Sequence, residues 1–380
     1  MKIEVNIVKT VFFSVLLYFI VFISVFSNNT ISKSKTLYEQ NELLIHESSA
    51  YFDSNIFTIG REFSLGEDTF VQLHIQKTAG TAFENHLLNH LEFKRGKKWE
   101  PACLTNTKQK RKVCNFALYK KPLIRDRYTC KYCDIHADYT ELHNCVMQDF
   151  KYRISYNPII KMSGNDIGIP HFITFLREPI QRYISEFEHL KRGAIWDKSV
   201  RSCLKQTIYS NKCFTGKSWN KTLTWPNYLK CEYNQANNRQ VRMLANYNLL
   251  GCNVLKCWTK SSSCSIKEKL INEEKILKSA KHTLIDMAFF GLVEHQQLSE
   301  YLFLKTFDQK RFKFSVPMID LHETIARNAI KGEANNYKEQ IAQNNHLDIQ
   351  LYEFAKEVFF KRIEFFSNID NNKNTFSFNN

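Results

Sequence analysis

The segment LHIQKTAGTAF, from Leu73 to Phe83, places a lysine, two threonines and a glycine within a few residues. Backbone and hydroxyl donors beside a cation are the groups that bind phosphate in proteins. In the P-loop of ATPases and GTPases the lysine follows the second glycine, whereas Lys77 precedes Gly80 here. The segment therefore predicts a phosphate-binding loop that differs from the usual nucleotide loop.

Two strand-loop-helix units are predicted to position such a site. Residues 69–75 alternate and are rich in β-formers, and apolar residues recur at helical spacing over residues 83–91. A second unit has a buried strand at residues 171–176, followed by Arg177 and by a helix that contains Ser185. With a lysine in the first unit and an arginine and a serine in the second, the pair indicates a ligand that carries phosphate at both ends.

The remaining patterns place these units in an α/β fold. Pro179 fits the first turn of the second unit's helix, where its missing donor costs nothing. Further helices are predicted at residues 266–288, 295–307 and 347–363. Strands that alternate with helices favour a central parallel sheet flanked by helices on both faces. The predicted domains are a cytoplasmic tail at 1–9, a transmembrane anchor at 10–26, a stem at 27–67, a lumenal domain at 68–366 and a disordered tail at 367–380.

The anchor prediction depends on an unbroken run of apolar and hydroxyl residues from Thr10 to Phe26, about long enough to cross a bilayer. Lys2 and Lys9 precede the run, which favours a cytoplasmic N-terminus, and no small-x-small cleavage signal follows it. A retained signal anchor is therefore favoured over a cleaved signal peptide, with the rest of the chain in a secretory lumen. Asn28 and Asn220 begin glycosylation sequons, which agree with that compartment.

Eleven cysteines are many for a cytosolic enzyme, and ten of them lie between Cys114 and Cys264. Two interpretations exist for part of this set. A zinc site is compatible with the ligand types of Cys130, Cys133, His136, His143 and Cys145. Disulfides are favoured in an oxidising lumen, and the odd number leaves one thiol unpaired or paired between chains.

The formal net charge is +15, and it is spread over several basic clusters. A lumenal protein meets little nucleic acid, so sulfated or carboxylated glycans and lipid head groups are the expected polyanions. For any one cluster, a solvated basic surface is the alternative. The clusters lie at residues 94–98, 108–112, 120–121 and 191–192.

Five segments, in this order, resemble the heparan sulfate 6-O-sulfotransferases: HIQKTAGTAF, CDIHADYTEL, FLREPIQRYISEFEHLKRGAIW, NQANNRQVRMLA and MAFFGLVEHQQLSEYLFLKTF. The resemblance covers about Thr69 to Ile363. Members of that family are single-pass type II Golgi membrane proteins with a lumenal catalytic domain. They transfer a sulfuryl group from 3′-phosphoadenosine 5′-phosphosulfate (PAPS) to the 6-hydroxyl of glucosamine in heparan sulfate. The resemblance thus implies a P-loop-like, PAPS-dependent sulfotransferase fold, and this reaction requires no metal.

The resemblance also implies roles for residues of the two units. Lys77 would contact the oxygen that joins phosphate to sulfur, where an ammonium stabilises the developing charge. Arg177 and Ser185 would bind the 3′-phosphate. The loop that would hold the 5′-phosphosulfate consists of Ile75, Gln76, Lys77, Thr78, Ala79, Gly80, Thr81, Ala82 and Phe83.

His136 matches the general base of the family, and an imidazole that titrates near neutral pH suits that task. His74, beside the loop, and His189 are the alternatives for the base. The residues predicted to contact the sugar chain are Lys120, Lys121, His136, His189 and Trp196.

Departures from the family pattern bear on acceptor fit and cofactor affinity. Ala79 stands at a glycine position, at a cost of about 1 kcal/mol if its φ is positive. Lys131 and Tyr139 replace tryptophans, and Ile325 replaces an arginine. The family also matches Cys133, Cys145, Cys231 and Cys252, which supports disulfides over zinc.

The alternatives are a sulfotransferase of another glycosaminoglycan acceptor or position, and an inactive glycan-binding homologue. Retention of both His136 and Lys77 argues against the inactive homologue.

Overall fold

The computed structural model of the chain describes residues 63, 68–101, 103–106, 111–114, 136–156, 170–194, 200–203, 206–209, 213, 219–252, 254, 264–308, 310–318 and 333–376. The chain divides into two compact units, Met1–Phe57 and Thr58–Asn380, and every described residue belongs to the second. The predicted anchor at 10–26 therefore lies outside the described residues. Among the helices that are described, none combines the length and apolar composition needed to cross a membrane.

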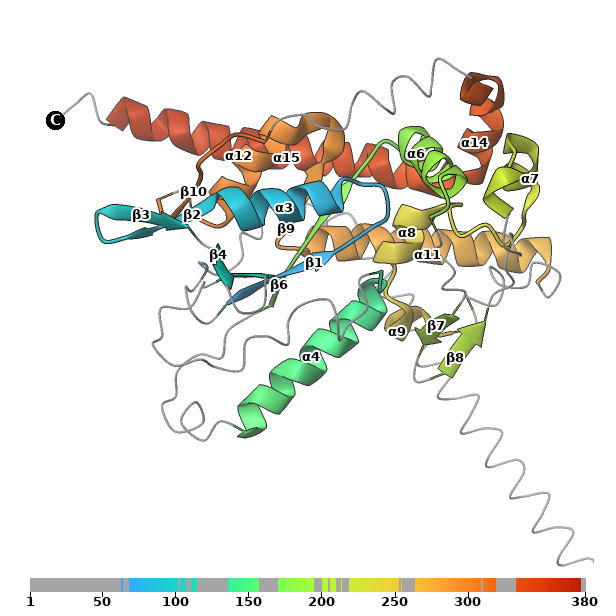
Figure 1. The fold of residues 1–380 in the computed structure, drawn as a ribbon, viewed down its shortest axis with the longest axis horizontal. Helices are drawn as coiled ribbons and strands as arrows, with labels where there is room; N and C mark the ends of the chain where they lie inside the picture. Colours follow the sequence, from blue (N-terminus) through green and yellow to red (C-terminus); the bar gives the residue numbers. More distant parts are fainter. Residues whose placement is uncertain are drawn as a thin grey trace, which may run out of the picture. The chain divides into compact units, whose positions relative to one another are not determined.

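A three-stranded parallel sheet forms the centre of the second unit, with β6 (Pro170–Leu176) between β1 (Thr69–Leu73) and β9 (Phe289–Leu292) (Figure 1). Val71 pairs with Phe172 across one side of β6, and Thr174 pairs with Phe290 across the other. All residues of β9 and most of β6 are buried, as expected for parallel strands with helices on both faces. The structure confirms the predicted α/β class.

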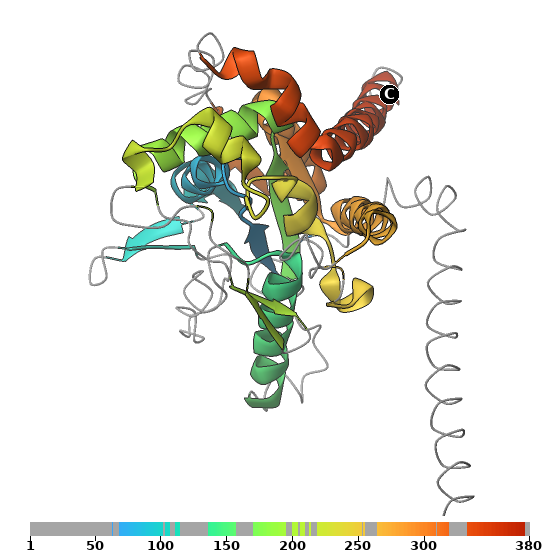
Figure 2. The same ribbon diagram turned by 90° about the vertical axis from the view of Figure 1, so that its right-hand side faces the viewer.

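The other elements are arranged around this sheet (Figures 1 and 2). The longer helices are α3 (Gly80–His90), α4 (Tyr139–Tyr156), α6 (Pro179–Lys191), α11 (Ile266–Asp286), α12 (Gln296–Thr306) and α15 (His346–Phe376). The shorter helical segments are η1 (Trp219–Lys221), α7 (Trp225–Lys230), α8 (Arg239–Leu244), α9 (Tyr247–Leu250), η3 (Val293–His295), η4 (Glu333–Tyr337) and α14 (Lys338–Asn344). A second, antiparallel sheet has the order β10-β2-β3, from β2 (Leu91–Arg95), β3 (Lys98–Pro101) and β10 (Phe312–Phe314). Two antiparallel pairs join β4 (Cys103–Asn106) to β5 (Arg111–Cys114) and β7 (Val200–Cys203) to β8 (Gln206–Tyr209).

Aromatic side chains of β9 join the sheet to helices on both of its faces. The ring of Phe289 packs against Phe83 of α3 and Phe303 of α12, with centroids 6.1 Å and 5.3 Å away. The next residue, Phe290, packs against Phe359 of α15 at 6.4 Å. Because successive strand residues point to opposite faces, α3 and α12 cover one face and α15 covers the other.

Local sequence explains where the predicted helices begin. The Ser265 hydroxyl accepts a hydrogen bond from Glu268 N, and the Glu268 carboxylate accepts one from Ser265 N, so a capping box starts α11. Pro179 is the first residue of α6, as predicted, and the Glu178 carboxylate accepts from Ile180 N and Gln181 N. The predicted strand at 69–75 ends earlier, at Leu73, where the loop begins.

Both boundaries predicted for the folded domain differ from those of the structure. Phe63, within the predicted stem, is buried, and its ring lies 4.6 Å from that of Phe70. At the other end, α15 continues to Phe376, beyond residue 367, where the sequence favours a disordered tail. Asp370 accepts a hydrogen bond from the Tyr301 hydroxyl and forms an ion pair with Lys305 at 2.5 Å. These two contacts attach the last turns of α15 to α12.

Candidate active site

The loop between β1 and α3 has an unusual backbone, which the sequence indicates at Ala79 but not at Lys77. Lys77 and Ala79 both have positive φ, 67° and 58°, although neither is a glycine. The Thr78 hydroxyl donates to the Ile75 carbonyl at 2.9 Å and so braces the turn. The strain anticipated for Ala79 is present, and it costs about 1 kcal/mol relative to glycine. A loop held in this form presents Lys77 ahead of the N-terminus of α3, where an anion is stabilised.

Gly80 occupies a position that leaves no room for a side chain. Its φ is not positive, and it is the first residue of α3. A Cβ at this position would lie 2.9 Å from His74 Cδ2 and 3.1 Å from Gln72 Nε2. The Gln72 amide also donates to the Gly80 carbonyl at 3.0 Å. The glycine is therefore required because the side chains of the preceding strand and turn pack directly against it.

Several cations meet at this loop. Burial lowers the pKa of the Lys77 ammonium, and the nearby Arg192 and Arg177 lower it further. The pKa of His189 is lowered by burial and then by Lys77 and Arg192, so this imidazole belongs to the same cluster. Each of these cations disfavours the charged form of its neighbours, and an anion that binds between them offsets this repulsion. The cluster thus joins the first predicted unit to the C-terminal end of α6.

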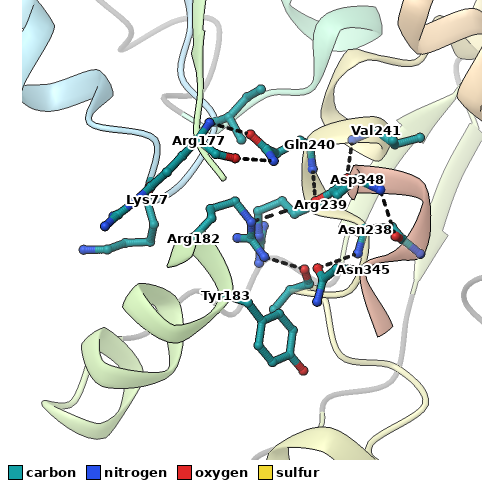
Figure 3. A network of polar contacts seen from close by, with 12 residues as sticks. Lys77, Arg177, Arg182, Tyr183, Asn238, Arg239, Gln240, Val241, Asn345 and Asp348 are labelled. Atoms are coloured by element: carbon teal, nitrogen blue, oxygen red, sulfur yellow. Dashed lines mark hydrogen bonds and ion pairs between the residues drawn. The ribbon is translucent and has the colours of Figure 1, made fainter. Parts of the chain in front are cut away.

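Arg177 follows the last residue of β6, and its side chain is directed to the loop. Its Nη1 donates to the Lys77 carbonyl at 3.3 Å, although the two residues are 100 positions apart in the chain. Figure 3 shows the side chains of Lys77 and Arg177 extending side by side, away from the buried polar network behind them. Ser185 lies on α6 and is half-buried. The two predicted strand-loop-helix units therefore meet where Arg177 contacts the loop of Lys77.

His136 lies just before α4, and its ring packs edge-on against His74, with centroids 5.5 Å apart. Burial, and then the proximity of His136, lower the pKa of His74 to about 4. His74 is consequently neutral near neutral pH, and an imidazole with so low a pKa is a weak base there. Because His74 also packs on Gly80, it connects His136 with the loop that carries Lys77.

The start of α4 is held by the NQANNRQVRMLA block. The Thr140 hydroxyl donates to the Ala245 carbonyl at 3.3 Å and accepts from Tyr247 N at 2.7 Å. Tyr139, one of the departures from the family pattern, packs its ring against Phe172 of β6 at 5.6 Å. Burial raises the pKa of its phenol. Tyr139 thus contributes to the covering of the sheet beside His136.

A network of buried charges lies behind the candidate anion site, and the sequence alone does not indicate it. Glu186 accepts hydrogen bonds from Arg182 and Arg239, all three being buried. Asp348 of α15 lies 3.9 Å from Arg182 Nε. Buried ions of opposite sign at this density are a feature of tertiary packing. The family-like block supplies Arg239 and Gln240, but its pattern by itself did not indicate which residues they contact.

Some predicted site residues lie outside the described part of the chain: Lys120, Lys121, Trp196 and Asn28, together with the departures Lys131 and Ile325. Asn220, the second sequon asparagine, is half-buried in η1 and donates from Nδ2 to the Lys191 carbonyl at 3.5 Å.

The cysteines support disulfides over the zinc alternative. Cys213 and Cys231 form a disulfide with a Cα–Cα distance of 5.8 Å. Cys145, a candidate zinc ligand, is also disulfide-bonded, and so are Cys252 and Cys264. A cysteine in a disulfide has no thiolate to offer a metal. Within the described ranges, no group of three or more His, Cys, Asp or Glu side chains could hold a metal ion.

Comparison with known proteins decides the family. The model of the sulfotransferase family matches residues 63–355. The chain belongs to the sulfotransferase family. This sulfotransferase is 36% identical to heparan-sulfate 6-O-sulfotransferase 1-B of Danio rerio over 304 residues, which cover 79% of the chain and 68% of that relative. It is 36% identical to heparan-sulfate 6-O-sulfotransferase 3 of Homo sapiens over 308 residues, 78% of the chain and 58% of that relative. Heparan-sulfate 6-O-sulfotransferase 2 of Gallus gallus is 35% identical over 306 residues, 79% of the chain and 69% of that relative.

These relatives confirm the family resemblance of the five segments. The chain spans less than two thirds of the length of the human relative, and slightly more than two thirds of the other two. Membership of the family makes the sulfotransferase a transferase enzyme, and it implies a sulfonate donor such as PAPS. A loop that carries a lysine at a helix N-terminus, with an arginine beside it, suits a donor with several anionic groups.

Proposed function

We propose that the enzyme transfers a sulfuryl group from PAPS to the 6-hydroxyl of glucosamine residues in heparan sulfate. Its relatives of 35–36% identity are named heparan-sulfate 6-O-sulfotransferases. The observation that carries the proposal is the contact of His136 with His74, which packs against the loop of Lys77. This contact supports the assignment of the base and the cation to one site.

In this mechanism the loop from Ile75 to Phe83 holds the 5′-phosphosulfate, and Arg177 and Ser185 bind the 3′-phosphate. PAPS supplies the sulfuryl group. His136 removes the proton from the acceptor hydroxyl as its oxygen forms a bond to sulfur. Lys77 donates to the oxygen that joins phosphorus to sulfur. It stabilises the electron pair that this oxygen keeps when its bond to sulfur breaks. No step in this sequence calls on a metal.

The electrostatics of the described residues support these roles. Lys77 carries a pKa lowered by burial and by two arginines, so an anion that binds there gains from each cation. His74, with its pKa near 4, brings no positive charge next to His136 at neutral pH. Among the residues that the structure describes, His189 is the candidate for contact with the acceptor, because it lies in the cluster with Lys77 and Arg192. Lys120, Lys121 and Trp196 stay predictions.

The chain's location is also part of the proposal. The apolar run at 10–26 and the lysines before it support a type II Golgi membrane protein with a lumenal catalytic domain. The disulfides agree with an oxidising compartment.

The test uses radiolabelled PAPS and desulfated heparan sulfate, followed by disaccharide analysis of the product. We expect label at the glucosamine 6-hydroxyl. Label at another position, or transfer only to chondroitin, would support the alternative sulfotransferase, and binding without transfer would support the inactive homologue.

The variant His136→Ala should abolish transfer and retain binding of 3′,5′-ADP, the spent nucleotide. His90→Ala, at the far end of α3, is the matched control and should keep both. Loss of both transfer and nucleotide binding in His136→Ala would show that the residue acts structurally.

A further inference from the structure

Gln240 makes an uncommon contact with the residue that presents the guanidinium to the anion site. Its side-chain Oε1 accepts from Arg177 N, and its Nε2 donates to the Arg177 carbonyl, both at 2.9 Å (Figure 3). The two residues are 63 positions apart, and Gln240 is fully buried. β6 ends at Leu176, so Arg177 lies beyond the hydrogen bonds of the sheet. The Gln240 amide supplies hydrogen-bond partners for its backbone N–H and carbonyl instead.

The position of Gln240 is itself determined by reciprocal capping of two helices. The Asp348 carboxylate of α15 accepts from Gln240 N at 3.1 Å and Val241 N at 2.8 Å, in the first turn of α8. In return, the Asn238 side-chain oxygen, just before α8, accepts from Leu347 N at 2.9 Å and Asp348 N at 3.2 Å. Each helix thus satisfies donors that the other leaves unpaired.

The contact leaves Arg177 little freedom at either end. Gln240 engages its backbone N–H and carbonyl, and the Lys77 carbonyl accepts from Nη1 at 3.3 Å. The primary amide of Gln240 offers a neighbouring donor and acceptor in one plane, which is what pairing with both groups of one residue requires. A shift in this backbone would displace the guanidinium from the loop.

We propose that Gln240 is a positioning residue for the 3′-phosphate of the nucleotide, acting through Arg177. The inference rests on the proposed function, because it takes Arg177 as the 3′-phosphate ligand. It predicts that Gln240 contributes more to the affinity of a nucleotide that carries a 3′-phosphate than to the affinity of one that lacks it.

Two variants of Gln240 separate its hydrogen bonds. Gln240→Met removes donor and acceptor at similar volume, and Gln240→Glu keeps an acceptor and removes the donor. Calorimetric titration of each with 3′,5′-ADP and 5′-AMP gives the readout. We expect Gln240→Met to weaken 3′,5′-ADP binding between about 10- and 100-fold, the cost of moving a positioned group by about 1 Å. Binding of 5′-AMP should weaken by a clearly smaller factor, because Arg177 acts on the 5′-phosphate only through its charge near Lys77 and not as its ligand.

The companion variant Arg177→Ala completes a double-mutant cycle. In its background, Gln240→Met should cause no further loss of 3′,5′-ADP affinity, because the group that Gln240 positions is absent. Equal weakening of both nucleotides, an unchanged 3′,5′-ADP affinity, or loss of folding in both Gln240 variants would overturn the proposal. A wild-type enzyme that binds the two nucleotides equally would instead refute the proposed role of Arg177.

Discussion

Glu186 permits a test of the buried network that supports the site. Its carboxylate accepts from Arg182 Nη1 at 2.5 Å, and from Arg239 Nε at 3.0 Å and Nη2 at 2.5 Å. Glu186 and Arg182 are 1% and 0% exposed, so bulk water cannot solvate the arginine charge that remains when the carboxylate is removed. The substitution Glu186→Gln keeps the shape of the side chain and removes its charge. It leaves two buried guanidinium groups without the carboxylate that both contact, while Asp348 stays 3.9 Å from Arg182 Nε.

The expected loss follows from the cost of breaking a buried ion pair. Removal of one partner costs about 3–5 kcal/mol, because the remaining charge is left without compensation. With roughly 300 folded residues and an unfolding entropy of about 2.1 cal/mol/K per residue, that loss lowers Tm by about 5–8 °C.

The pH dependence of this loss has a defined sign. Burial by itself would raise the pKa of the Glu186 carboxyl, but Arg239 and Arg182 together lower it. Its contribution to stability is therefore fully present above the unfolded pKa, about 4.3, and is lost as the pH falls through the lower folded value. The difference in Tm between wild type and Glu186→Gln should be constant from about pH 7 to pH 5 and should narrow below about pH 4.

Scanning calorimetry at these pH values measures both quantities. Glu188→Gln is the matched control, since it removes the same charge from a half-buried residue of the same helix. Its Tm should stay within about 1 °C of wild type, as for surface substitutions in general. A Tm for Glu186→Gln within 1–2 °C of wild type would refute the claim that this carboxylate neutralises the two arginines.

Three further predictions concern the loop and the surface. Ala79→Gly should raise the free energy of unfolding by about 0.5–1 kcal/mol in urea titrations, because glycine adopts the positive φ without strain. Gly80→Ala should displace His74 and so lower kcat more than it weakens 3′,5′-ADP binding, since the added Cβ would lie 2.9 Å from the His74 ring. Replacing Lys94 and Lys98, both exposed on the β2–β3 pair, with alanine should raise KM for heparan sulfate polymer by roughly 2- to 10-fold at low salt.

Two of these predictions have a matched control variant, and the third has a result that would contradict it. Ala82→Gly, in the first turn of α3, should lower stability by up to about 1 kcal/mol, and a gain there would contradict the φ argument. For Gly80→Ala, an unchanged kcat would show that the position of His74 does not affect the transfer. Lys267→Ala with Lys269→Ala removes two exposed charges from α11. An equal rise in KM in that variant would mean that net charge alone, rather than the surface near β2 and β3, attracts the glycan.

Local patterns in the sequence determined much of the framework. The alternation before Lys77 and the helical spacing after it located β1 and α3, because strand and helix periodicity are encoded in neighbouring residues. The same physics located β6 and α6, including Pro179 at the first helical position. Residue type, order and family resemblance also indicate Lys77, Arg177 and His136 as candidate site residues.

The tertiary structure alone decided which distant groups complete the site. It paired Gln240 with the Arg177 backbone and Arg239 with Glu186, across separations of 63 and 53 residues, and it brought His74 between Gly80 and His136. It also extended the folded unit to Phe63 and Phe376. The choice of such partners depends on which polar groups become buried together, and that is settled by packing in three dimensions, not by the spacing of residues along the chain.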